Sequence, residues 1–317
     1  MQISSSMKTN FKDYLKSKAF TAKSIQSRMV VFNQYLKWIE RENPSAGRAG
    51  LEIGQVSYND LLLFMKHCQH KGVSQRTIQH YMIVVRHFYD YLVREGITTT
   101  NPATDIVVRG AKRKALYHIL EPHDLQALYN QYPVATIKDR RNKVILGLLV
   151  YQGLRTEELA RLEVKDIKLR EGKIDVLGGR KSNGRLLELA PGQVMDMYDY
   201  VLQIRNEIAA MKPKRKAQTR KETDKLFIGE GGNCYSFSNM MTQLMIKVRK
   251  ISRSLSGPTV QNAKQVRASV ITKWLKAYNL REAQYLAGHR YISSTESYLQ
   301  NDMEGLKEEV QQYHPLG

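Results

Sequence analysis

The chain has 317 residues, 42% hydrophobic and 25% charged, which is typical of a folded protein long enough for two domains. Fifty Lys and Arg against thirty Asp and Glu give a net charge of +20, which predicts a polyanionic partner. Nucleic acid is the first candidate for this partner, and an acidic membrane surface is the second. The longest apolar run, residues 144–151, is too short to span a bilayer. Because the first residues also lack the apolar segment of a secretory signal, we expect a cytoplasmic protein.

Residues 1–105 predict a small helical domain. Apolar residues at helical spacing indicate three helices, within residues 24–39, 57–72 and 74–96. Ser57 with Asp60 three residues later is typical of an N-cap and its acidic partner. Four histidines occur here, but they lack carboxylate or cysteine partners at ligand spacing, and the whole chain has only two cysteines. We therefore expect neither a metal site nor a disulfide framework.

Basic residues on the third helix and after it are candidate contacts to DNA phosphates. The alternative for the helix is an ordinary solvated face, and the alternative for the connector, residues 106–118, is a plain tether. The candidates on the helix are Arg76 and Arg86, and those in the connector are Arg109, Lys112, Arg113 and Lys114.

The second domain, residues 119–317, is expected to begin with helices. The apolar run from 142 to 152 predicts a buried helix that ends at Gly153, and Thr156 can begin another. Arg155 then lies in the elbow between the two, where a charge is costly without a partner. A pair with Glu158 is one possible partner, and a bound phosphate is another.

A β region follows. Residues 164–169, KIDVL and RLLEL predict a three-stranded antiparallel meander, so the fold class is mainly α with a small antiparallel sheet. The second loop, GGRKSNG, carries Arg180 and Lys181 at its tip. Lysines on exposed hairpins are usually only solvated, but a mobile one could also reach a leaving group.

The last part of the chain combines basic groups with one hydroxyl. A helix expected from residue 262 to about 278 carries Lys264 and Arg267 on one face near its N-terminus, an end that favours anions. The run LAGHRYISSTESYL then supplies His289 at the end of a short helix and Tyr298 nine residues later, near the start of the next. These groups are what a phosphodiester needs if a side chain is to attack it.

These motifs resemble the tyrosine recombinases, also called phage integrases, and in particular the compact two-domain Xer type. GLRTEEL, KQVR and LAGHRYISSTESYL match the family's motifs in order, and the resemblance covers almost the whole chain. It implies a SAM-like helical DNA-binding domain followed by an α+β catalytic domain with a C-terminal tail helix, residues 303–316. In the family such a tail docks into a neighbouring protomer, and the alternative is that it docks on its own domain. The resemblance also implies phosphate contacts from Arg155, Arg267 and His289, and a nucleophile at Tyr298.

The chain departs from the family's pattern at two positions. Lys264 stands where the family usually has His, and the loop GGRKSNG replaces Gly-Lys-Gly. For the hairpin lysine we choose Lys181, with Arg180 as the competing candidate. A lysine there could protonate the departing 5′ oxygen, and a lysine at position 264 can still serve the phosphate.

The resemblance implies a site-specific DNA recombinase that forms a covalent 3′-phosphotyrosine and therefore needs no metal, nucleotide or other cofactor. It implies a tetramer on two recombination sites that exchanges strands through a Holliday junction, for integration, excision or dimer resolution, with a directionality factor as a possible accessory partner. We expect it at the nucleoid. The alternatives are a DNA-binding protein that has lost catalysis and a relaxase similar to type IB topoisomerases.

Overall fold

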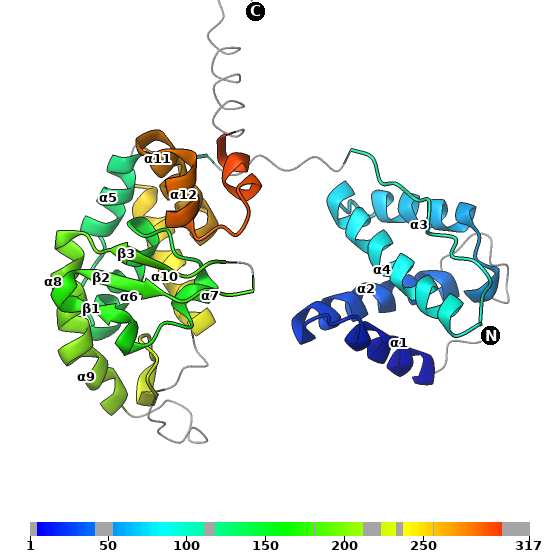
Figure 1. The fold of residues 1–317 in the computed structure, drawn as a ribbon, viewed down its shortest axis with the longest axis horizontal. Coiled ribbons are helices and arrows are strands. Elements are labelled where there is room, and N and C mark those ends of the chain that lie inside the picture. Colours follow the sequence, from blue (N-terminus) through cyan, green and yellow to red (C-terminus); the bar gives the residue numbers. More distant parts are fainter. Residues whose placement is uncertain are drawn as a thin grey trace, which may run out of the picture. The chain divides into compact units, whose positions relative to one another are not determined.

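The computed structural model describes residues 5–41, 53–110, 118–180, 182–211, 223–232, 237–255 and 257–299. The chain divides into two compact units, residues 1–114 and 115–317 (Figure 1). This division falls inside the basic connector expected at residues 106–118. Among the described helices, none is both long and apolar enough to cross a membrane.

The first unit is a helical bundle around an aromatic core. Its helices are α1 (Ser5–Ser17), α2 (Ala22–Arg41), α3 (Tyr58–His70) and α4 (Gln75–Arg94). The rings of Phe11, Phe32 and Phe88 lie 4.7 to 5.3 Å from one another, and all three are buried. Aromatic rings at these separations add to the stabilisation that comes from burying their surface.

The cap predicted for α3 is present. The backbone N–H of Ser57 donates to the Asp60 carboxylate at 2.9 Å, and the backbone N–H of Asp60 donates to the Ser57 hydroxyl at 3.3 Å. These reciprocal bonds satisfy two groups that the start of a helix leaves without intrahelical partners. The helix α1 was not predicted, although its buried side chains, Met7, Phe11, Tyr14 and Leu15, recur at helical spacing.

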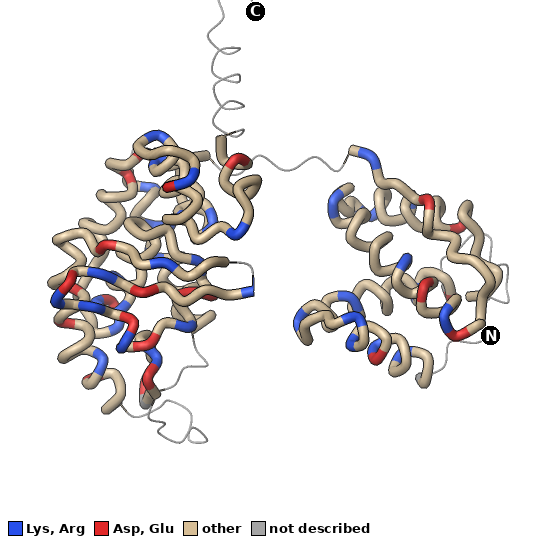
Figure 2. The backbone as a smooth tube through the Cα atoms, viewed as in Figure 1, with Lys and Arg blue, Asp and Glu red and all other residues tan. Residues whose placement is uncertain are grey.

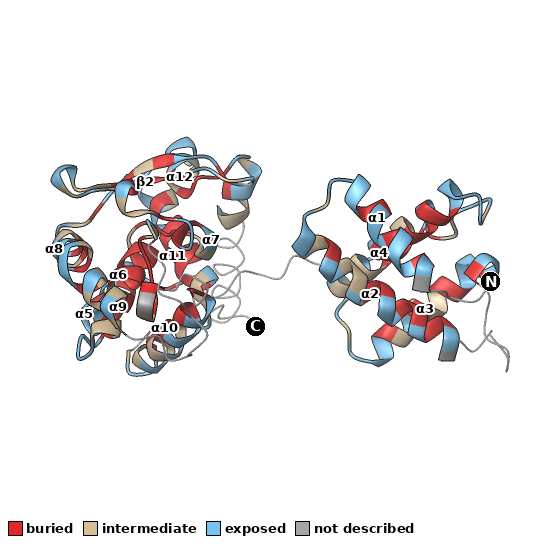
Figure 3. Ribbon diagram, turned by 90° about the horizontal axis from the view of Figure 1, so that it is seen from below, coloured by how far each residue is buried: buried red, intermediate tan, exposed pale blue. Residues whose placement is uncertain are grey.

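The second unit packs helices around a buried pair and a small sheet. Its helices are α5 (Pro122–Asn130), α6 (Ile137–Val150), α7 (Thr156–Leu159), α8 (Pro191–Asp199), α9 (Arg205–Ala210), α10 (Phe237–Ser252), α11 (Ala263–Ala277) and α12 (Leu280–Ala287). A further helical segment covers residues 293–299. The pair α6 and α11 is largely buried among the other elements (Figure 3).

The sheet is antiparallel in the order β1 (Ile167–Lys168), β2 (Lys173–Val176) and β3 (Arg185–Glu188). The predicted meander is therefore present, but its first strand is shorter than expected. Only two of its residues pair, and short 3₁₀ turns flank them. The first turn forms because the Asp166 carboxylate accepts the backbone N–H of Glu163 at 2.8 Å, a local bond that competes with strand pairing.

The helices of this unit also differ from those predicted. The helix α6 begins five residues before the apolar run, because the Thr136 hydroxyl caps the backbone N–H of Asp139 at 3.1 Å and Arg141 and Asn142 are buried against other elements. The helices α8 and α9 were not predicted. They are joined by a π-helical segment, residues 200–204, and they form one continuous helical stretch after the sheet.

Candidate active site

Arg155 lies where the sequence places it, in the elbow between α6 and α7. Gly153 makes the turn with a φ of 54°, a left-handed conformation that suits glycine. The backbone N–H of Arg155 then donates to the Glu158 carboxylate at 2.9 Å and so begins α7. The Arg155 side chain keeps 27% of its surface exposed, so its guanidinium is available to a ligand.

Arg267, on α11, is almost fully buried and links the two ends of the site. Its Nη1 donates to the carbonyl of Gly153, and its Nη2 donates to the carbonyl of Ala287 at 2.6 Å. Burial lowers its pKa to about 10, with a further contribution from the nearby charge of Arg155. Arg267 therefore stays protonated at neutral pH, and it holds the start of α7 next to the end of α12.

His289 is buried beside Arg267 in its neutral form. The two side chains meet at 3.2 Å between Nη2 of Arg267 and Nε2 of His289, while Nδ1 of His289 lies 2.9 Å from the Thr295 hydroxyl. Since a guanidinium can only donate, Nε2 accepts, and the ring proton is on Nδ1, donated to Thr295. Burial, then the charges of Arg267 and Arg155, lowers the pKa of His289 to about 3.

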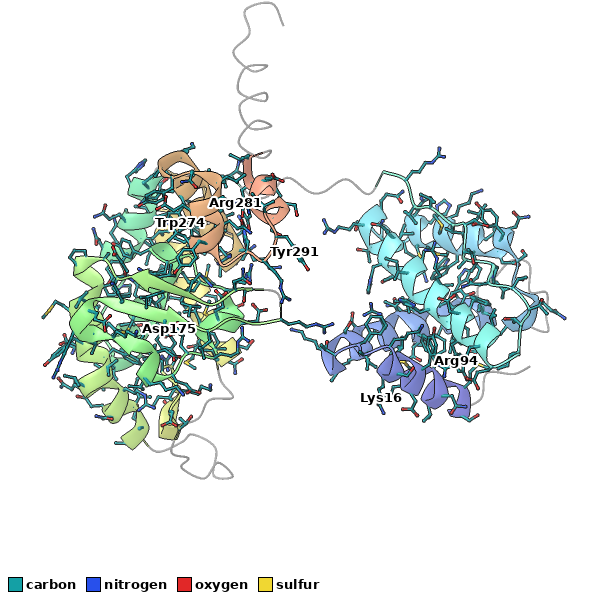
Figure 4. The ribbon with its side chains drawn as sticks, viewed as in Figure 1. Lys16, Arg94, Asp175, Trp274, Arg281 and Tyr291 are labelled. Atoms are coloured by element: carbon teal, nitrogen blue, oxygen red, sulfur yellow. The ribbon has the colours of Figure 1, made fainter. Side chains whose placement is uncertain are left out.

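Tyr298 is half-buried on the segment 293–299 and lies next to His289. The two rings are 5.9 Å apart between centroids, with their planes 15° from parallel. Tyr291, by contrast, is 68% exposed, and it projects from the surface (Figure 4). The hydroxyl of Tyr285 accepts the backbone N–H of Leu186 at 3.3 Å. Among these three tyrosines, Tyr298 alone packs its ring against His289 in the described structure.

Lys264 is exposed at the N-terminus of α11. The side chain of Asn262 caps this end and accepts the backbone N–H groups of Lys264 at 3.0 Å and Gln265 at 3.1 Å. Lys264 borders an open groove of about 790 Å³ that is lined by the start of α7, including Thr156, and by one face of α10. Lys264 therefore lies near the N-terminus of α11, three residues before Arg267, as the sequence predicts.

The hairpin between β2 and β3 is tied to the segment that carries His289. Ser182 pairs with His289 across an isolated bridge, and the backbone N–H of Asn183 donates to the carbonyl of Gly288 at 3.2 Å. Nη1 of Arg290 donates to the carbonyl of Arg180 at 3.2 Å. The Arg180 side chain is exposed. Lys181 itself lies outside the described residues.

Two buried residues of the site were not foreseen as a pair. Nη1 and Nη2 of Arg185 donate to the two carboxylate oxygens of Glu158 at 3.1 and 3.0 Å. Glu158 therefore has Arg185 as its main partner, whereas Nη1 of Arg155 stands 3.8 Å away. The sequence did indicate that Arg185 is buried, because the alternation of side chains along β3 places Arg185 on the same inward face as Leu187.

The remaining candidates for DNA contact are distributed over both units, as are Lys and Arg in general (Figure 2). The side chains of Arg76 and Arg109 are exposed. Arg86 instead donates to the carbonyls of Ala103 at 3.1 Å and Ile106 at 3.0 Å, and so holds the segment that follows α4. Outside the described residues lie Lys112, Arg113, Lys114 and the tail 303–316. No group of three or more potential metal ligands occurs within the described ranges.

The buried neutral His289 should make folding stability depend on pH. Its pKa is about 3 in the folded protein against an ordinary value of 6.5. Between these two pH values His289 is protonated in the unfolded chain but not in the folded protein, so the free energy of unfolding falls as the pH falls through this window. Lowering the pH from about 7 to about 5 should cost the wild type about 2 kcal/mol more than His289→Asn. Urea unfolding at both pH values measures this difference, and an equal loss in both proteins would contradict the neutral His289.

The comparisons with known proteins agree with this fold. Residues 118–305 match the phage integrase family, and residues 45–96 match the N-terminal SAM-like domain of phage integrases. Since the first match alone spans more than half of the chain, the protein belongs to the phage integrase family, whose members are tyrosine recombinases.

Relatives of this family match along most of the chain. The protein is 26% identical over 310 residues to the tyrosine recombinase XerC of Bacillus pumilus, covering 96% of this chain and 95% of that protein. It is 28% identical over 265 residues to the tyrosine recombinase XerD of Oceanobacillus iheyensis, covering 82% and 83%.

Solved structures show the same fold. One is the XerH site-specific recombinase bound to its difH substrate in a pre-cleavage complex, with a TM-score of 0.68, 16% identity and coverage of 94% of this chain and 82% of that one. Another is a lambda integrase dimer bound to a COC′ core site, with a TM-score of 0.64, 13% identity and coverage of 92% and 94%. The predicted fold class, mainly helical with a small antiparallel sheet, is confirmed.

Proposed function

We propose that this protein is a site-specific DNA recombinase that cuts and rejoins DNA through a covalent 3′-phosphotyrosine. The observation that carries this proposal is the meeting of two guanidiniums, a histidine and a tyrosine from four separate segments of the chain. Arg155 lies just before α7, Arg267 on α11, His289 just after α12 and Tyr298 on the segment 293–299. Family membership and the net charge of +20 support DNA as the substrate.

In the proposed reaction, Tyr298 attacks the scissile phosphate. A phenol with a pKa of about 10 is a weak nucleophile at neutral pH, so it depends on neighbouring cations and on proton transfer. Arg155 and Arg267 would bind the non-bridging oxygens and stabilise the charge that builds on them in the transition state. The P–O bond to the 5′ side breaks as the bond to Tyr298 forms, and the departing oxygen needs a proton.

For His289 we propose a contact with the same phosphate. Its Nε2 accepts from Arg267 in the free protein, so a hydrogen bond from His289 to phosphate requires that Nε2 gain a proton when DNA binds. The approaching negative charge of the phosphate favours this protonation. For the proton on the leaving oxygen we propose Lys181, with Arg180 as the competing residue of the same hairpin, which is tied to His289 through Ser182.

The binding of DNA would extend beyond the site. We propose phosphate contacts from Arg76, Arg109, Lys112, Arg113, Lys114, Arg180 and the exposed part of Arg86. By its resemblance to Xer recombinases, the protein would act as a tetramer on paired sites, with the tail 303–316 docked into a neighbouring protomer. These proposals require that the enzyme be located in the cytoplasm, in association with the nucleoid.

The function is tested with duplex DNA that carries the recombination site and a nick next to the scissile phosphate. The short fragment diffuses away after cleavage, so a covalent protein–DNA adduct accumulates. Intact paired sites then report strand exchange. An adduct with exchange is the expected result. An adduct with relaxation of supercoils but without exchange would indicate a topoisomerase-like relaxase, and binding without any adduct would indicate a DNA-binding protein that has lost catalysis.

Lys264→Ala should slow formation of the adduct roughly 100-fold, which is the lower end of what one proton-transferring or charge-stabilising group contributes. DNA affinity should change little, because a single phosphate contact is lost from many. Lys273→Ala is the matched control, since Lys273 is an exposed lysine on the same helix that borders a separate cavity at the start of α5. An unchanged single-turnover rate in Lys264→Ala would show that Lys264 is only a solvated cation.

A further inference from the structure

Arg185 is a buried cation with no access to DNA. Its side chain and that of Glu158 are 0% and 1% exposed, and the two form a bidentate pair at 3.0 and 3.1 Å. The remaining Nε–H of Arg185 donates to the carbonyl of Leu286 at 2.8 Å. Gly288 covers the guanidinium so closely that a Cβ there would stand 2.3 Å from Nη1. Arg185 therefore cannot touch a bound phosphate, and any effect it has on cleavage must pass through its partners.

Glu158 has three guanidiniums around it and makes a close pair with only one. Nη1 of Arg155 stands 3.8 Å from one carboxylate oxygen and Nη1 of Arg267 stands 4.0 Å from the other. Both distances exceed hydrogen-bond length, whereas Arg185 is within it at both oxygens. Burial alone would raise the pKa of Glu158, but the hydrogen bonds and charge of Arg185 lower it below its usual value, so the carboxylate is ionised.

Without Arg185, the buried Glu158 carboxylate would keep the backbone N–H of Arg155 at 2.9 Å but would have no cation within hydrogen-bond distance. Such a charge strongly destabilises the fold unless it recruits a cation. The nearest cations are Arg155 and Arg267, which are the two groups proposed to bind the scissile phosphate. A shift of less than about 1 Å would bring either guanidinium into hydrogen-bond range of Glu158. Each arginine that Glu158 captures loses part of its attraction for the phosphate.

We propose that Arg185 is a positioning residue for DNA cleavage, which neutralises Glu158 and so keeps Arg155 and Arg267 free for the scissile phosphate. This inference rests on the proposed recombinase function. It assigns Arg185 a role through charge, distinct from the support that its bond to Leu286 gives to the end of α12.

The test uses Arg185→Met, Arg185→Lys and the double variant Arg185→Met with Glu158→Gln. The single-turnover rate of adduct formation is measured on the nicked substrate at saturating DNA, below the melting temperature of every variant. Arg185→Met should cleave roughly 100-fold more slowly, the usual loss when a phosphate-stabilising donor is withdrawn. Arg185→Lys keeps a cation beside Glu158 and should stay within about 10-fold of wild type. The double variant should recover to a similar rate, because a neutral amide in place of the Glu158 carboxylate recruits neither arginine.

A role limited to holding the fold predicts a different pattern. Both Arg185→Lys and the double variant lose the bond to Leu286, so on this view both would cleave as slowly as Arg185→Met. Cleavage that slow in either variant overturns the inference. If Arg185→Met does not fold, the rates of the other two variants decide alone. An absence of adduct in the wild type would overturn the proposed function and this inference together, whereas a wild-type adduct without recovery in the double variant overturns only the role of Arg185.

Discussion

Tyr298→Phe should abolish the covalent protein–DNA adduct and leave the fold and the affinity for DNA intact. The substitution removes the hydroxyl that would attack phosphorus, while the ring that packs 5.9 Å from His289 remains. Removing a nucleophile outright lowers the rate by roughly 10⁴-fold or more. The measurement is adduct formation on the nicked substrate, with thermal melting and a DNA-binding titration to show that the variant is folded.

The matched control is Tyr291→Phe, because Tyr291 is exposed and lies seven residues before Tyr298. This control should form the adduct at the wild-type rate. Adduct formation by Tyr298→Phe would show that another nucleophile attacks the scissile phosphate, and the proposed mechanism would then be wrong.

Arg155→Ala should lower the rate of cleavage roughly 100- to 1000-fold, the loss expected when a transition-state donor is removed from an electrostatic site. The effect on stability should be small, since the Arg155 side chain is 27% exposed and its closest carboxylate contact is 3.8 Å. The backbone N–H of Arg155 that begins α7 is unchanged by the substitution. Single-turnover cleavage and urea unfolding separate the two effects.

Arg281→Ala is the control for general loss of positive charge, because Arg281 is exposed on α12 (Figure 4) and bonds only its neighbour Gln284 in the described structure. It should cleave at nearly the wild-type rate. Equal rates for Arg155→Ala and the wild type would remove Arg155 from the catalytic site.

Much of the fold could be predicted because its signals are local. The caps at Ser57 and Asn262 and the turn at Gly153 are each determined by a few neighbouring residues, and the structure contains all three. The unpredicted elements depend on distant partners. The sequence of α1 has a local helix signal in Met7, Phe11 and Leu15, but the contacts of Phe11 with rings of α2 and α4 that hold this helix join distant residues.

The candidate site divides in the same way. Its ordered motifs led to Arg155, Arg267 and His289, and the structure brings these three together, while their catalytic roles stay predictions. The pairing of Glu158 with Arg185 could not be predicted, because it joins residues 27 positions apart whose meeting depends on how β3 packs against α7. The neutral state of His289 depends likewise on burial and on the charge of Arg267.

The most direct test of the central claim is to locate the bond between protein and DNA. The wild-type adduct is trapped on the nicked substrate, digested with nuclease and trypsin, and sequenced by mass spectrometry. Cleavage after Arg290 and Lys307 gives one peptide, residues 291–307, that contains both Tyr291 and Tyr298. A 3′-linked nucleotide on Tyr298 is the predicted result. The same mass on Tyr291 or any other residue, or a link to the 5′ end of the DNA, would contradict the proposed mechanism.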